Sequence, residues 1–207
     1  RKQGKIIVNG RVQKAVLHAA GRAVPMRQNA RRRTGRGSSM RRNACCFTGH
    51  RAIAPEDRVP LQTALRAEIR ALCERGVTAF YAGGARGFDM LAAEAVLEAR
   101  ETLPVALHLI LPCRDQCRGW PLAERMRYDA ILSRADSVRY VADAYTADCM
   151  RRRNDALVAA AGHCVCYLQR DRGGTAYTVR RARAAGLEII HLMTADPVQT
   201  ALPGTGE

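Results

Sequence analysis

The strongest constraint on the fold is a regular alternation of two sequence patterns that begins at residue 44. Short apolar runs, rich in β-branched and aromatic residues, predict buried strands at 44–48, 77–81, 105–111, 137–141, 163–168 and 187–192. Longer amphipathic segments predict helices at 55–75, 90–100, 116–134, 146–161 and 173–185, and the third of these is expected to be interrupted or to restart near Pro121. Strands and helices that alternate in this way form parallel βαβ units. We therefore expect a Rossmann-like, three-layer α/β fold with a mostly parallel sheet of about six strands.

One strand-to-helix turn is unusually rich in glycine. The segment Tyr81-Ala82-Gly83-Gly84-Ala85-Arg86-Gly87-Phe88-Asp89 joins the second expected strand to its helix. Such a turn presents backbone N–H groups beside a helix N-terminus, where the helix dipole also favours an anion. It matches neither the dinucleotide fingerprint G-x-G-x-x-G nor the Walker sequence. By itself the turn fits a phosphate cradle and a plain tight turn equally well.

Other strand ends carry similar signals. Thr48-Gly49-His50-Arg51 follows the first strand, Pro112-Cys113-Arg114 the third, and Asp171-Arg172-Gly173-Gly174-Thr175 the fifth. Ligands of open parallel sheets bind beyond the carboxyl ends of the strands, so these segments are expected to converge on one site. The predicted ligand-binding residues are Thr48, Gly49, His50, Arg51, Gly83, Gly84, Ala85, Gly87, Asp89, Pro112, Arg153, Asn154, Gly173, Gly174 and Thr175. The sequence identifies no catalytic residue.

Some of these residues have a plain structural alternative. Asp89 is expected either to hold ribose hydroxyls or to stabilise the dipole of the helix that it begins. Thr175 is either a ligand contact or a helix N-cap. Arg153 and Asn154 follow Arg151 and Arg152 on one helix. Successive helical residues point about 100° apart, so only one or two of these side chains can face a pocket.

Two aromatic residues and the cysteines are further candidates for a functional role. Trp120 and Tyr128 suit either stacking on a base or core packing, and packing is the more common role. Cys113 lacks a nearby base in sequence, which favours packing over nucleophilic catalysis. A zinc site from Cys113, Cys117 and His108 lacks a fourth ligand, so no metal is predicted. The eight cysteines include no C-x-x-C pair and are expected to be reduced, buried thiols of a cytoplasmic protein.

The net charge of +15 is unevenly distributed. Residues 1–43 hold 13 of the 34 basic residues and no acidic residue, which leaves 21 basic and 19 acidic residues, a balance of +2, for the remainder. We expect 1–43 to be a disordered basic tail, 44–192 the folded domain and 193–207 a C-terminal tail. Translation is expected to begin at Met40. Nucleic-acid binding through the basic tail is the least favoured function, and no apolar run is long enough for a membrane span.

A family resemblance rests on five ordered motifs. These are Cys46-Phe47-Thr48-Gly49-His50-Arg51, the segment 83–89, Leu111-Pro112-Cys113 with Gln116 and Trp120, Arg153-Asn154, and Gly173-Gly174-Thr175. Together they resemble the YpsA family of the SLOG superfamily, which also contains DprA-like and LOG-like proteins. The resemblance covers residues 44–192. It implies a Rossmann-like pocket for a nucleotide or nucleotide derivative, such as an ADP-ribose- or NAD-like compound, in a sensor or regulatory protein linked to cell division and stress.

Departures from the relatives bear on activity. LOG-like phosphoribohydrolases carry P-G-G-x-G-T-x-x-E, and Thr178 stands where their catalytic Glu is found. A nucleotide-processing hydrolase is therefore the alternative function, with Asp89 or Asp171 as its acid. DprA-like proteins bind single-stranded DNA through a basic surface, which a body of +2 does not suggest. The expected partners are a nucleotide-derived small molecule, a second copy of the chain and a protein partner in division or stress, with no other cofactor.

Overall fold

The computed structural model describes residues 3–8, 11–17, 23–25 and 41–193, and the chain divides into two compact units, residues 1–38 and 39–207. The first unit contains an antiparallel sheet in which β1 (Gln3–Val8) pairs with β2 (Arg11–Leu17), and β2 with β3 (Ala23–Pro25). The expectation of a disordered tail over residues 1–43 remains a prediction. Met40 and the C-terminal residues 194–207 lie outside the described residues.

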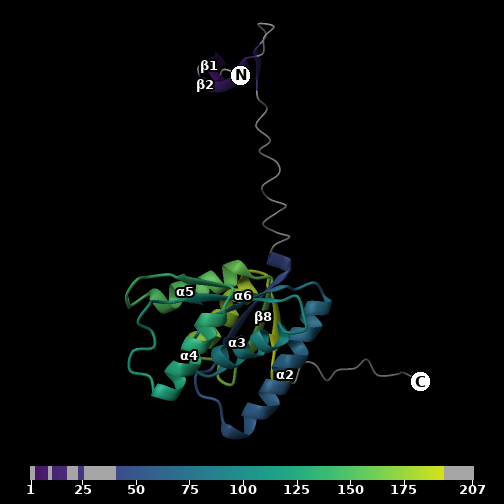
Figure 1. Ribbon diagram of the computed structural model, residues 1–207, viewed down its shortest axis with the longest axis vertical. Coiled ribbons are helices and arrows are strands. Elements are labelled where there is room, and N and C mark those ends of the chain that lie inside the picture. Colours follow the sequence, from purple (N-terminus) through teal and green to yellow (C-terminus); the bar gives the residue numbers. More distant parts are fainter. Residues whose placement is uncertain (1–2, 9–10, 18–22, 26–40, 194–207) are drawn as a thin grey trace, which may run out of the picture. The chain divides into compact units, whose positions relative to one another are not determined.

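The second unit is a three-layer α/β domain, as predicted (Figure 1). Its strands are β4 (Ala44–Gly49), β5 (Ala79–Ala82), β6 (Ala106–Leu111), β7 (Ser137–Tyr140), β8 (His163–Tyr167) and β9 (Glu188–His191). Its helices are α2 (Pro55–Glu74), α3 (Phe88–Ala99), α4 (Leu122–Arg134), α5 (Cys149–Ala160) and α6 (Gly173–Ala184).

Helix α4 begins at Leu122, in agreement with the expected restart of the 116–134 helix near Pro121. Pro121 occupies the N-cap, and proline disfavours the helical conformation of the residue before it. Gly119 adds a backbone φ of +78°, which no continuous helix accommodates. Residues 115–119 form turns instead.

The six strands of the domain are all parallel and follow the order β7-β6-β5-β4-β8-β9. From β4 the chain proceeds outward through β5 and β6 to β7, then returns through α5 to the other side of β4, where β8 and β9 follow. The direction of the connections therefore reverses between β4 and β8. In open α/β sheets this switch point is where ligands bind, outside the carboxyl ends of the strands.

Alternating side chains of the central strand pack into two cores, one on each face of the sheet. Cys45 and Phe47 belong to the core formed with α2, α3 and α4, whereas Ala44 and Cys46 belong to the core formed with α5 and α6. This period-2 alternation on a strand that is buried on both faces explains the nearly continuous apolar sequence of β4. It also assigns the helices to opposite layers: α2, α3 and α4 on one side, α5 and α6 on the other (Figure 1).

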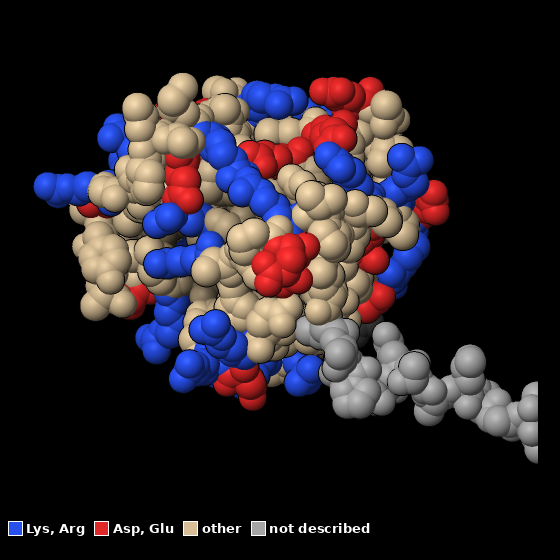
Figure 2. All heavy atoms as spheres, turned by 90° about the horizontal axis from the view of Figure 1, so that it is seen from below, with Lys and Arg blue, Asp and Glu red and all other residues tan. Residues whose placement is uncertain are grey.

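Charged side chains of the domain are mixed in sign over its surface. Figure 2 shows basic (blue) and acidic (red) side chains interspersed over one face of the molecule. All three lysines of the chain lie within residues 1–14, so the basic residues of the domain are arginines. Because the two signs are mixed, the face in Figure 2 shows no continuous basic stripe of the kind that follows a nucleic-acid backbone.

The cysteines are all free thiols, and six of the eight are buried, which confirms their predicted packing role. Within residues 3–8, 11–17, 23–25 and 41–193, no group of three or more His, Cys, Asp or Glu side chains is arranged to hold a metal ion. Over the same residues, no helix has the length and apolar character needed to cross a membrane.

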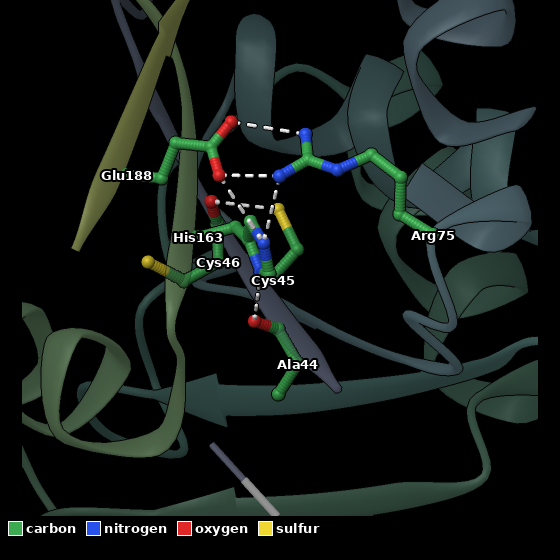
Figure 3. A network of polar contacts seen from close by, with 6 residues as sticks. All are labelled: Ala44, Cys45, Cys46, Arg75, His163 and Glu188. Carbon is green, nitrogen blue, oxygen red and sulfur yellow. Dashed lines mark hydrogen bonds and ion pairs between the residues drawn. The ribbon is translucent and has the colours of Figure 1, made fainter. Parts of the chain in front are cut away.

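A polar network joins the amino-terminal ends of three strands to the C-terminal end of α2 (Figure 3). It lies at the opposite ends of the strands from the cavity. Arg75, which follows α2, donates from Nη1 to Oε1 of Glu188 at 2.9 Å and from Nη2 to Oε2. Nε2 of His163 lies 3.4 Å from Nη2 of Arg75, and its Nδ1 lies 3.3 Å from the carbonyl oxygen of Ala44. The network therefore fixes β4, β8 and β9 at the end that carries no candidate site residue.

Candidate functional site

A cavity of about 860 Å³ lies over the carboxyl ends of β4 and β8, at the switch point of the sheet. Five segments line it: residues 47–54 with the first turn of α2, the turn before α3, one face of α5, the end of β8, and the N-terminus of α6. Its volume falls within the range of typical small-molecule pockets, which is about 300–1,000 Å³.

Eleven of the fifteen predicted site residues line this cavity, and the fold thus brings together segments from across the sequence. They are Thr48, Gly49, His50, Arg51, Ala85, Asp89, Arg153, Asn154, Gly173, Gly174 and Thr175. The other four, Gly83, Gly84, Gly87 and Pro112, do not line it. Of four consecutive residues of α5, Arg153 and Asn154 face the cavity, whereas Arg151 and Arg152 are exposed to solvent. This division agrees with the angle of about 100° between successive helical side chains.

The glycines of the 83–87 turn serve close packing. A Cβ on Gly83 would lie 1.6 Å from Nη1 of Arg153, and one on Gly84 would lie 2.6 Å from Cδ2 of Leu111. A Cβ on Gly87 would lie 2.2 Å from the carbonyl oxygen of Arg51. Of the predicted residues in this turn, only Ala85 lines the cavity. The glycines instead allow the backbone of residues 50–51 to pack closely against the start of α3.

A buried ion pair crosses the floor of the cavity. Nη1 of Arg153 lies 3.1 Å from Oδ2 of Asp89, and the two residues are only 7% and 4% exposed. The amide of Ala85 also donates to Asp89 Oδ2, at 3.3 Å. Burial raises the pKa of the Asp89 carboxyl above its ordinary value, while Arg153 and the Ala85 amide oppose that rise. Nε of Arg153 is buried and has no hydrogen-bond partner within the described residues, which leaves one donor of this cation unused.

The N-terminus of α6 opens directly into the cavity. Gly173, Gly174 and Thr175 are its first residues, and no side chain caps it. The first amides of a helix have no acceptor within the helix, so they are free to donate to an anion and are aided by the helix dipole. The 82° φ of Gly173 explains why glycine begins this helix.

Thr178, which stands where LOG-like enzymes carry a glutamate, does not reach the cavity. Its side chain is fully buried and donates from Oγ1 to the carbonyl oxygen of Gly174 at 2.8 Å. Asp171, the other acid considered from sequence, is exposed and forms an ion pair with Arg180. Among the residues that line the cavity, the carboxylates are Asp57 and Asp89.

The cavity rim is cationic. Arg51, Arg170 and Arg172 line it and are exposed. None of the three side chains forms an ion pair or hydrogen bond with another residue in the described part of the chain. Guanidinium groups that are not neutralised by protein carboxylates, placed beside free helix amides, suit a phosphate or another anion.

Two residues that sequence reasoning did not assign to the site form part of its wall. The hydroxyl of Tyr167 donates to Oδ2 of Asp57 at 2.7 Å, and both residues line the cavity. The ring of Tyr167 stacks on Phe88 at 6.0 Å between centroids. Trp120 and Tyr128 pack edge to face at 5.4 Å in the core beside α4, away from the cavity lining, as their packing alternative predicted.

His50 gives the site a dependence on pH. Its Nε2 accepts a hydrogen bond from the amide of Gln169 at 2.9 Å, and burial, followed by the charge of Arg170, lowers its pKa below the ordinary 6.5. Below pH 6.5 the unfolded chain therefore binds a proton at His50 more readily than the folded chain does. The contribution of His50 to the free energy of unfolding falls as the pH falls from 6.5 toward the folded pKa. We expect His50→Gln to reduce this slope in urea denaturation measured between pH 5 and 7. An identical slope in both proteins would contradict this role for His50.

A family model and several known proteins resemble this chain. The model YpsA, described as the YspA SLOG family, matches residues 54–194. A UPF0398 protein of Halalkalibacterium halodurans is 35% identical over 79 residues, which span 38% of this chain and 42% of that protein. The cavity residues Thr48, Gly49, His50 and Arg51 precede the residues matched by the family model.

Two solved structures share the fold. DNA processing protein A of Helicobacter pylori, whose structure is described as giving insight into its single-stranded DNA binding mode, has a TM-score of 0.54 at 16% identity over 76% of this chain and 67% of that chain. DNA processing protein A of Streptococcus pneumoniae has a TM-score of 0.56 at 16% identity over 73% of this chain and 50% of that chain. At this identity the likeness concerns the fold.

Proposed function

This chain belongs to the YpsA SLOG family, and we propose that its cavity binds a nucleotide or nucleotide derivative of the ADP-ribose or NAD type through a phosphate group. The proposal is carried by one observation: the uncapped N-terminus of α6 lies beside three arginines at the switch point of a parallel sheet, and within the described residues no side-chain ion pair or hydrogen bond engages these arginines. Free amides and unpaired guanidinium groups together form an anion site of the kind that phosphate esters occupy.

A binding role, as in a sensor or regulator, accounts for the cavity better than hydrolysis does. The position of the LOG-type glutamate is held by Thr178, whose hydroxyl is bonded to its own helix. Asp89 is bonded to Arg153 and to an amide, and Asp57 to Tyr167. Each carboxyl is thus already engaged by a group of the protein. Turnover of the bound nucleotide remains the alternative, and product analysis distinguishes it.

DNA binding rests on a different feature and is the weaker proposal. A single-stranded DNA binding mode is described for the Helicobacter pylori protein, which shares the fold at 16% identity. The charge of residues 44–207 balances to +2, and the face drawn in Figure 2 mixes both signs. Self-association and a protein partner in division or stress also remain proposals that rest on the family alone.

Removal of a rim arginine is expected to weaken ligand binding selectively. Arg51→Gln and Arg172→Gln should each reduce the affinity for ADP-ribose or NAD by about 10-fold or more, because a hydrogen bond to a charged group contributes about 1.5–3 kcal/mol. Arg118→Gln is the matched control, since Arg118 is exposed and does not line the cavity. Isothermal titration of the full chain measures the affinities, and chromatography of the mixtures detects any product.

The outcomes separate the alternatives. Binding of an intact compound that both rim variants weaken supports a binding protein, and product formation assigns a hydrolase. Equal affinities of the rim variants and the Arg118→Gln control would place the ligand elsewhere. No increase in Tm with any of ADP-ribose, NAD, AMP or pyrophosphate would contradict the proposal, because a ligand that binds the native state raises its stability.

A further inference from the structure

Asp57 is the more accessible of the two carboxylates that line the cavity. It lies in the first turn of α2, and its Oδ2 accepts the hydroxyl of Tyr167 at 2.7 Å. Its Oδ1 has no hydrogen-bond partner in the described part of the chain, and the residue is only partly buried where it lines the cavity. Asp89 differs in its surroundings, because it is almost fully buried and its charge is balanced by the buried Arg153, from which its Oδ2 accepts a hydrogen bond together with the amide of Ala85.

Tyr167 fixes the direction of the Asp57 carboxylate. Its ring stacks on Phe88 at 6.0 Å with an angle of 21° between planes, and His50 packs against its edge at 6.1 Å. A phenol held by two rings presents its hydroxyl in one place, so the carboxylate that accepts this hydroxyl is also held. Asp57 is therefore pre-oriented before any ligand arrives.

The two chemical characters of the cavity come from opposite layers of the fold. Asp57 enters from α2, which packs on one face of the sheet, whereas the free amides of Gly173 and Gly174 enter from α6 on the other face. The lining thus contains a carboxylate acceptor on α2, beside Arg51 of the preceding loop, and backbone donors on the α6 side. An ionised carboxylate accepts hydrogen bonds and repels phosphate, so it selects a part of the ligand that carries hydroxyl donors.

We propose that Asp57 is the specificity-determining residue of the site and accepts hydrogen bonds from the vicinal hydroxyls of a ribose whose phosphate lies at the N-terminus of α6. This inference rests on the proposed function and assigns to Asp57 the ribose contact that the sequence suggested for Asp89. The ligand class is then a ribonucleoside phosphate with free 2′- and 3′-hydroxyls. A ligand that carries a second phosphate on those hydroxyls is rejected by charge.

The test compares ligands within each variant by isothermal titration of the full chain. The probes are AMP, 2′,3′-dideoxy-AMP, adenosine 3′,5′-bisphosphate and pyrophosphate. The unmodified protein is expected to bind AMP at least about 10-fold more tightly than the dideoxy analogue, because the analogue lacks the hydroxyls that donate hydrogen bonds to the charged acceptor. Asp57→Asn is expected to reduce that ratio severalfold, to leave pyrophosphate affinity unchanged or higher, and to gain affinity for the 3′,5′-bisphosphate.

The gain in bisphosphate affinity is the decisive readout, because a merely damaged fold does not bind a new ligand more tightly. Glu56→Gln is the matched control: it removes one negative charge from the same helical turn, but Glu56 is exposed and does not line the cavity. It should change none of the ratios. Tyr167→Phe keeps the ring and removes the hydroxyl, so it should lower the AMP-to-dideoxy ratio while retaining pyrophosphate binding.

Two results would overturn the inference while sparing the proposed function. One is an AMP-to-dideoxy ratio near one in the unmodified protein that nevertheless binds AMP. The other is an Asp57→Asn protein with unaltered ratios and no gain for the bisphosphate. Failure of every probe, pyrophosphate included, to bind the unmodified protein would instead contradict the phosphate site itself.

Discussion

Arg153→Met is expected to lower the free energy of unfolding by about 3–5 kcal/mol, because it leaves the Asp89 carboxyl buried without its cation. Urea denaturation followed by circular dichroism measures the change. Arg66→Met provides the control, since Arg66 forms a comparable ion pair with Glu98 in which both side chains are about half exposed. An exposed pair contributes about 0–1 kcal/mol.

A second substitution tests the assigned cause. Asp89→Asn introduced into the Arg153→Met protein removes the unpaired carboxylate and should recover part of the lost stability, whereas additive losses would show that the two residues do not act as a pair. If Arg153→Met costs no more than Arg66→Met, the buried pair does not hold the cavity floor together.

Gly87→Ala is expected to destabilise the domain by about 2–5 kcal/mol, from a left-handed backbone and from overpacking. The φ of Gly87 is +74°, and an added Cβ would lie 2.2 Å from the carbonyl oxygen of Arg51. That oxygen belongs to backbone and cannot rotate away as a side chain does. Phe88 also donates its amide to the carbonyl of His50, at 3.2 Å, so a shift of the 50–51 segment would disturb the start of α3.

Gly76→Ala isolates the conformational part of this cost. Gly76 has a φ of +89°, yet nothing lies within 4 Å of a Cβ built on it. It should therefore cost only about 1–2 kcal/mol, the price of the left-handed conformation. Thermal and urea unfolding of both variants give the comparison, and equal losses would mean that the contact with residue 51 is not a close one.

The elements that sequence predicted well are those set by local pattern. Strand β4 reads as apolar because both of its faces are buried, and α2 shows its start through Pro55 and two acids in the first turn. Pro121 marked a restart of the 116–134 helix, and α4 begins directly after it, because the backbone restrictions of Gly119 and Pro121 exclude a continuous helix.

The site was predicted in outline and revised in detail. The switch point required segments after β4 and β8 to converge, and they do. The role of the 83–87 glycines was less accessible, because the atoms that exclude a side chain there belong to residues 51, 111 and 153. Asp57 gave only the signal of an acid in a first turn, which the helix dipole explains without any ligand.

The pairing of β4 with β8 has a consequence for how the site comes into being. These neighbours are separated in the sequence by three other strands and four helices, so their contact closes the longest loop of the sheet. The entropic cost of closing a loop rises with its length, so the pairing of β4 with β8 costs more than that of β5 with β6, which closes a shorter loop. The cavity straddles this seam and takes walls from both sides of it. The cavity thus forms only once the return crossover has placed β8 beside β4.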